Sequence, residues 1–148
     1  MDHQQLWQEF IRVFPQYREA VYEPWLYGSD DPDLLLRLTL EGVKTATASS
    51  LPLYEYENEQ PPQAGQLSVI SDTKGQARCV VRAVRVYTVP FRQVPAEQAW
   101  KEGEGDRSLD YWRRVHEDFF TLEMKEAGLS FSWDMPVVCE EFELLYKK

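Results

Sequence analysis

A lysine and a threonine stand three residues apart in the stretch 42–47, and both carry groups that can take part in chemistry. The ammonium of Lys44 could bind a phosphate, or in a suitable pocket activate a neighbouring hydroxyl such as that of Thr47. The alternative is structural, because a lysine beside a helix C-terminus neutralises the free carbonyl groups there. Residues three apart point to opposite faces of a regular strand, so the two share a site only if the chain bends between them.

A second candidate group is the acidic glycine turn at 102–106, where Glu102, Glu104 and Asp106 alternate with glycines. Carboxylate oxygens are preferred ligands of Mg²⁺ and Mn²⁺, and one or two carboxylates suffice when phosphate and water complete the shell. One of them could equally act as a general base for a hydrolytic water. The structural alternative is a polar loop in which Asp106 or Ser108 caps the next helix, although capping does not account for all three acids.

Aromatic and basic side chains elsewhere are candidates for ligand contacts. Trp25, Tyr27 and Tyr54 could stack on a base, and Arg78 could contribute to a local basic surface. Core packing is the competing interpretation of the aromatics, and exposure on a sheet face that of the arginine. His116 could bind phosphate or carry a proton, or it could be a partly buried histidine bonded to a backbone carbonyl.

The elements that position Lys44 are predicted from capping and periodicity. The leucine-rich segment 34–40 predicts a helix that starts at Asp30 or Asp31, with a proline in its first turn. Gly42 follows this helix at the position that favours the left-handed conformation. Small and β-branched residues come next and predict a buried strand, so Lys44 should lie in the turn between helix and strand.

Periodicity also predicts the other elements. They are a helix over 4–14, a long loop over 51–62, one long strand or two joined strands over 77–89, a short helix over 96–101, a helix over 109–127 with a buried stripe of Leu109, Trp112, Val115, Phe119 and Leu122, and a last strand over 137–146. Glu140 falls on the apolar side of that last strand. We expect it to be buried and paired with Lys44 or an arginine of the long strand.

Composition limits the class of protein. The 148 residues, 43% of them apolar, fit a single domain over 1–148 with residues 1–24 as an N-terminal helical extension. No apolar run approaches the roughly 20 residues that span a bilayer, and the polar N-terminus is not a signal peptide, so we expect a cytoplasmic protein without a membrane partner. We interpret Cys79 and Cys139 as buried thiols, with a disulfide between them as the alternative. The net charge of −9 argues against sequence-blind binding of long nucleic acids.

The chain resembles the ASCH domain family, relatives of the PUA-like fold, and in particular its longer bacterial members. The match runs from about Trp25 to Tyr146 and rests on Gly42-x-Lys44-x-x-Thr47, Trp25-x-Tyr27-Gly28, Glu102-Gly103-Glu104-Gly105-Asp106, Trp112-x-x-x-His116 and Cys139-Glu140-x-Phe142. The resemblance agrees with the predicted elements in implying an α+β fold, with a small, mostly antiparallel PUA-like β-barrel flanked by helices. The site is then expected between barrel and helices.

The resemblance also implies a ligand that is RNA or nucleotide-like, and it leaves three functions open. The favoured one is a metal-assisted ribonuclease on short single-stranded RNA, with Lys44 on the scissile phosphate and Mg²⁺ or Mn²⁺ on the carboxylates of Glu102, Glu104 and Asp106. The second is an amidohydrolase of acylated nucleosides, with Thr47 as nucleophile, Lys44 as proton acceptor and Glu102 as general acid/base. The third is an RNA-binding module without catalysis.

Overall fold

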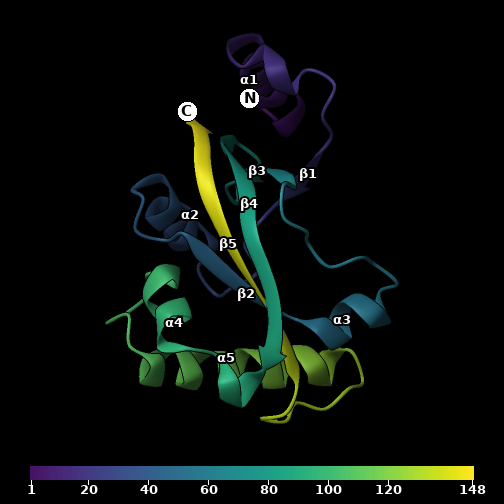
Figure 1. Cartoon of the computed structure of the whole chain (residues 1–148), viewed down its shortest axis with the longest axis vertical. Coiled ribbons are helices and arrows are strands. Elements are labelled where there is room, and N and C mark those ends of the chain that lie inside the picture. Colours follow the sequence, from purple (N-terminus) through teal and green to yellow (C-terminus); the bar gives the residue numbers. More distant parts are fainter.

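The computed structural model describes residues 1–148 as one mixed sheet with helices at both ends (Figure 1). The helices are α1 (His3–Val13), α2 (Pro32–Leu40), α3 (Leu51–Tyr56), α4 (Ala96–Glu102) and α5 (Leu109–Glu126), with 3₁₀ turns η1 (Pro15–Tyr17) and η2 (Phe91–Gln93). The strands are β1 (Tyr22–Trp25), β2 (Ala46–Ser50), β3 (Leu67–Ser71), β4 (Ala77–Pro90) and β5 (Pro136–Lys147). None of the helices has the length and apolar character that crossing a membrane requires.

The five strands are ordered β1-β3-β4-β5-β2. β1 runs parallel to β3, and the other three pairings are antiparallel. The expected α+β class and mostly antiparallel sheet are therefore confirmed. The expected barrel is not observed, because β1 and β2 lie at opposite edges and no pairing joins them. β1 also begins inside the segment 1–24 that was expected to be helical.

Helix starts and stops follow the local signals in the sequence. Asp2 caps α1 and Asp31 caps α2, each through a side-chain bond to a backbone N–H. Gly42 adopts a φ of 77° after α2, as only glycine does at low cost. The predicted loop over 51–62 is wrong in its first half, where α3 forms. The second residue of α3 is Pro52. Proline is compatible with the first turn of a helix because the backbone N–H that it lacks would have no partner there.

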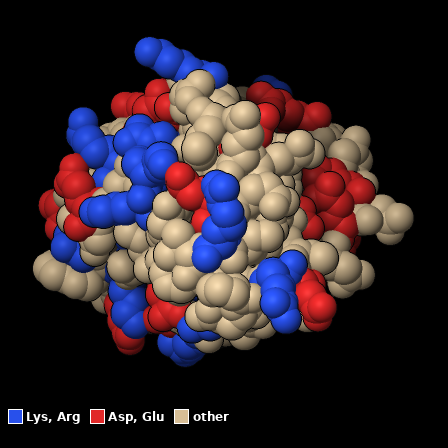
Figure 2. Space-filling view, turned by 90° about the horizontal axis from the view of Figure 1, so that it is seen from above, with Lys and Arg blue, Asp and Glu red and all other residues tan.

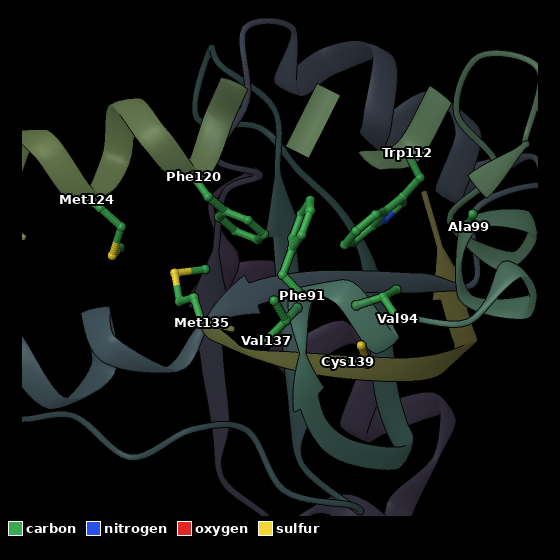
Figure 3. Close-up of a cluster of buried hydrophobic side chains, with 9 residues drawn as sticks. All are labelled: Phe91, Val94, Ala99, Trp112, Phe120, Met124, Met135, Val137 and Cys139. Atoms are coloured by element: carbon green, nitrogen blue, oxygen red, sulfur yellow. The ribbon is translucent and has the colours of Figure 1, made fainter. Parts of the chain in front are cut away.

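The sheet is covered by three apolar clusters. α1 packs on β3 and β4 near the upper end of Figure 1, while α2 covers another part of the sheet. The largest cluster lies between α5 and β5 and is shown in Figure 3, with Phe91 between the helix and the strand. The predicted stripe of α5 is only partly correct. Its buried residues are Trp112, Phe120 and Met124, which follow steps of four from Trp112, and Leu122 is 57% exposed on another side of the helix.

Candidate functional site

Lys44 lies in a bend between α2 and β2. The backbone N–H groups of Val43 and Lys44 both donate to the carbonyl of Leu38, at 2.9 and 3.1 Å, which wraps the end of α2. Regular strand structure begins only at Ala46. Lys44 thus lies in the irregular stretch after α2, two residues before the strand that bears Thr47.

The side chain of Lys44 is buried and held by two carboxylates. It is 1% exposed. Its Nζ lies 2.9 Å from Oε2 of Glu104 and 3.5 Å from Oε1 of Glu102. The ring of Tyr27 lies 5.6 Å from the same atom. A buried ammonium is stable only with such partners, so this lysine is more than a neutraliser of helix carbonyls.

Glu102 is fully buried and its carboxylate is surrounded by donors. Oε2 accepts from Trp112 Nε1 at 2.6 Å and from Gln98 Nε2 at 3.1 Å, and Nε2 of His116 lies 3.5 Å from Oε1. Burial by itself raises the pKa of Glu102. The charges of Lys44 and His116 and the hydrogen bonds of His116 and Trp112 outweigh burial and lower the pKa below its usual value. Glu102 is therefore a fixed anion of the site.

The glycine turn brings its two glutamates to Lys44 by close backbone packing. Gly103 has a φ of 73°, and a Cβ atom there would lie 2.7 Å from the carbonyl oxygen of Val43. Gly105 has a φ of 58°, and its Cβ would overlap the ring of Tyr111. The positive φ favours glycine at both positions, and at Gly103 the close approach to the Val43 backbone also excludes a side chain. This packing places Glu102 and Glu104 against the lysine bend.

The three carboxylates of this turn do not converge on one point. Glu102 and Glu104 both face Lys44, while Asp106 is exposed and its Oδ1 accepts from the backbone N–H of Ser108 at 2.9 Å. Ser108 caps α5, as predicted. No group of three or more His, Cys, Asp or Glu side chains is arranged to hold a metal ion. Of the three residues expected to bind Mg²⁺ or Mn²⁺, Glu102 and Glu104 contact Lys44 while Asp106 is turned away, and metal binding at this turn stays a prediction.

The three aromatic candidates lie in this region but differ in how far they are buried. Tyr27 is buried and its hydroxyl bonds to the hydroxyl of Thr39 at 2.7 Å. Trp25 is half-buried and packs on Tyr27, with ring centroids 4.8 Å apart. Tyr54 is half-buried on α3 and its hydroxyl lies 2.9 Å from Oγ of Ser49 on β2. Of the three, Trp25 and Tyr54 keep surface that a ligand can contact.

Two other candidates contact the protein itself. Nδ1 of His116 bonds to the carbonyl of Trp112 at 2.9 Å, and the two rings stack with centroids 4.1 Å apart. The histidine thus belongs to the network behind Glu102. Arg78 donates to the carbonyl of Lys148 at 3.1 Å, near the C-terminus, and the structure does not bring it to Lys44.

Glu140 is buried, as predicted, but without the predicted partner. It is 9% exposed, and burial raises its pKa to about 7. Lys44 is already held by the glycine turn. The arginines of β4 are also engaged, because Arg82 and Arg85 pair with other glutamates of β5. The expectation of an ion pair at Glu140 is wrong, because Lys44, Arg82 and Arg85 form their ion pairs with other glutamates.

A family model for the ASCH domain matches residues 23–146. The chain belongs to the ASCH domain family. The chain is 30% identical to an ASCH domain of known crystal structure from Lactobacillus crispatus, covering 92% of this chain and 94% of that one with a TM-score of 0.79. It is 34% identical to protein EF3133 from Enterococcus faecalis, covering 93% and 86% with a TM-score of 0.80.

A more distant structure shares the fold alone. The hypothetical protein PH0355 is 17% identical, covers 84% of this chain and 98% of that one, and superposes with a TM-score of 0.55. No protein with a curated description matches this ASCH domain. The resemblance noted in the sequence is therefore confirmed at the level of the family, and the chemistry must be inferred from the site itself.

The sequence did not reveal one member of the site. Gln98 of α4 is 1% exposed and its Nε2 donates both to Glu102 and to the carbonyl of Thr47, each at 3.1 Å. It thus joins the buried carboxylate to β2. The spacing of four residues between Gln98 and Glu102 places them on one helix face and was the only available signal.

A cavity of about 350 Å³ lies beside this site without containing its central residues. It is lined mainly by polar residues of β4, α4 and β5, including Tyr87, Gln98 and Glu141. Its charged groups are already paired, because Glu141 binds both Lys101 and Arg85. The buried cation of Lys44 and the carboxylates that contact it form the candidate site of this ASCH domain.

Proposed function

We propose that this ASCH domain is a metal-independent hydrolase that removes an acyl group from a nucleoside or a short nucleotide ligand. The observation that carries the proposal is the buried ammonium of Lys44, fixed by Glu102 and Glu104 at the start of the strand that bears Thr47. Hydrolysis of an amide creates an oxyanion in the transition state. A fixed cation in a site of low dielectric stabilises that charge.

The contacts favour a cationic role for Lys44. If Lys44 gave up its proton, two carboxylates would face each other without a counter-ion, and one of them is fully buried. Lys44 is therefore assigned to binding the developing negative charge. Thr47 supplies the nucleophilic hydroxyl, and Glu102, held by Trp112 and Gln98, orients the cation.

The same contacts speak against the metal-assisted ribonuclease. Its metal would have to bind Glu102 and Glu104, whose carboxylates already enclose Lys44. The net charge of −9 opposes long RNA, and Figure 2 shows basic and acidic side chains intermixed on the face that it displays. A mononucleotide or a short single strand remains compatible with this surface, with Trp25 and Tyr54 available for stacking.

The test is an assay of N-acylated nucleosides with the wild type, Lys44→Met and Thr47→Val, each with and without a chelator. We expect deacylation that resists the chelator and is lost in both variants. Lys125→Met is the control, because Lys125 is exposed on α5 and remote from the described contacts. The same proteins are incubated with a labelled single-stranded RNA and Mn²⁺. Chelator-sensitive RNA cleavage that Lys44→Met abolishes, without any deacylation, would replace the proposal by a ribonuclease.

A further inference from the structure

Glu140 stands directly beside Thr47 across two strands. β2 and β5 are antiparallel, and Thr47 is the residue paired with Glu140. Directly paired residues point to the same face of a sheet, and their Cβ atoms lie about 5 Å apart. The carboxyl of Glu140 is therefore within side-chain reach of the Thr47 hydroxyl.

The carboxyl of Glu140 has no partner of its own. The side chain is more than nine-tenths buried, and burial alone is the cause of its raised pKa of about 7. On its other side, in β4, Glu140 is paired with Val86, whose side chain offers no polar group. A mostly buried carboxyl to which no protein group donates is costly to ionise, and such groups are typical of functional sites.

The groups that face Glu140 are hydroxyls rather than cations. Burial raises the pKa of both Tyr27 and Tyr54, and the charge of Glu140 contributes to each of these shifts. The hydroxyl of Tyr27 is hydrogen-bonded to that of Thr39, and the hydroxyl of Tyr54 to that of Ser49. Neither tyrosine is hydrogen-bonded to Glu140. Glu140 is thus free to exchange a proton with whatever lies at Thr47.

We propose that Glu140 is the proton acceptor for Thr47, an inference that rests on the hydrolysis proposed above. Oγ1 of Thr47 attacks the acyl carbon while its proton passes to the Glu140 carboxylate. When the C–N bond breaks, the same proton goes to the leaving nitrogen, and an acyl ester of Thr47 remains. A water molecule then attacks this ester, gives its proton to Glu140, and Thr47 leaves as the alkoxide that recovers it, releasing the carboxylic acid.

This role of Glu140 differs from the amidohydrolase that the resemblance implied, in which Lys44 accepted the proton of Thr47. Lys44 keeps its proton and stabilises the oxyanion, whereas Glu140 changes its protonation state during turnover. A proton acceptor is most effective when its pKa lies near the working pH. Glu140, with a pKa of about 7, meets this condition. The partners of Glu102 lower its pKa, so that Glu102 stays ionised.

The experiment follows the deacylation of an N-acylated nucleoside from pH 5 to pH 9 with the wild type, Glu140→Gln, Glu140→Ala and Glu143→Gln. We expect the wild-type kcat to fall on the acid side with a midpoint near pH 7. Glu140→Gln should lose about 100-fold or more of kcat, together with this acid limb. Formate should partly restore Glu140→Ala, because a small carboxylate can occupy the vacated place. Glu143→Gln, on the same strand but half-exposed, should behave as wild type.

Each result bears on the assignment. Wild-type kcat and an unchanged acid limb in Glu140→Gln would overturn the role of Glu140 and leave the proposed hydrolysis standing. No deacylation by the wild type would remove both. If Glu140→Gln failed to fold by circular dichroism, the formate rescue of Glu140→Ala decides, and an inactive, folded Glu140→Ala that formate does not restore counts against the assignment.

Discussion

The Nζ atom of Lys44 lies 2.9 Å from Oε2 of Glu104, and this contact covers the more accessible side of the buried cation. The side chain of Glu104 is 19% exposed, whereas that of Glu102, the other partner of Lys44, is 2% exposed. Glu102 is also bonded to Trp112 and Gln98. Of the two carboxylates, Glu104 is therefore the one that an anionic ligand can displace from Lys44.

Replacement of Glu104 by glutamine should tighten the binding of anions at Lys44. The substitution removes the negative charge that competes with a ligand for the ammonium. We expect a nucleoside monophosphate to bind about tenfold more tightly, equivalent to about 1.4 kcal/mol, by isothermal titration calorimetry. The control is Glu97→Gln, because Glu97 is exposed and pairs with Lys101 instead. Equal affinity of wild type and Glu104→Gln would show that ligands do not reach Lys44 by this side.

Replacement of Lys44 by methionine should destabilise the fold. Methionine fills a similar volume but leaves the buried carboxylate of Glu102 without its counter-ion. The expected loss is about 3–5 kcal/mol in the free energy of unfolding, measured by urea denaturation at pH 7. The double variant Lys44→Met/Glu102→Gln should recover much of this loss, since no charge is then left unpaired. A double variant that is less stable than Lys44→Met alone would mean that the carboxylate is stabilised by Trp112 and Gln98 without the lysine.

The elements around Lys44 could be predicted because their signals are local. Caps such as Asp31, the glycine at 42 and the small residues after it each act within one turn of the chain. The same holds for Ser108 at the start of α5. Local sequence therefore located the lysine bend and the acidic turn as separate features.

Their meeting could not be predicted from either stretch. Lys44 and Glu102 are 58 positions apart, and they meet because α4 packs on β2, where the backbone N–H of Thr45 donates to the carbonyl of Lys101. The predicted ion pair of Glu140 was wrong for a related reason. Which cation finds which carboxylate depends on competition among all of them in three dimensions, and Arg85 lies across from Glu141 in the register of β4 and β5. The open edge at β1 likewise follows from strand order, which periodicity does not encode.

Gly103→Ala should disturb the site more than an equivalent change elsewhere. Gly103 has a left-handed φ of 73°, which a residue with a side chain rarely adopts. An added Cβ would also lie 2.7 Å from the carbonyl oxygen of Val43. Gly75 has a similar φ of 81° but open space around its Cβ position, so Gly75→Ala measures the conformational cost alone. We expect that cost to be about 1 kcal/mol and the loss for Gly103→Ala to be larger by about 1–3 kcal/mol in thermal or urea unfolding. Equal losses for the two variants would show that the backbone approach at Val43 relaxes freely.

Glu140 should make the fold less stable as the pH rises. Its pKa is raised by burial from 4.5 to about 7, so between these values the folded protein holds a proton that the unfolded chain has released. The free energy of unfolding then falls as the pH rises from about 4.5 to 7, and stays lower above it. The lowered pKa of Glu102 acts at more acidic pH, where stability is lost as its carboxylate is protonated.

The pH effect of Glu140 is measured as a difference between two proteins, because other groups then cancel. Glutamine keeps the shape of Glu140 and carries no charge at any pH. From pH 5 to pH 8, the stability of Glu140→Gln relative to wild type should increase by about 2–3 kcal/mol, measured by urea unfolding at both pH values. A constant difference would place the carboxyl of Glu140 in contact with water or with a donor in the folded protein. In that case Glu140 would be ionised throughout and would not change its charge near neutral pH.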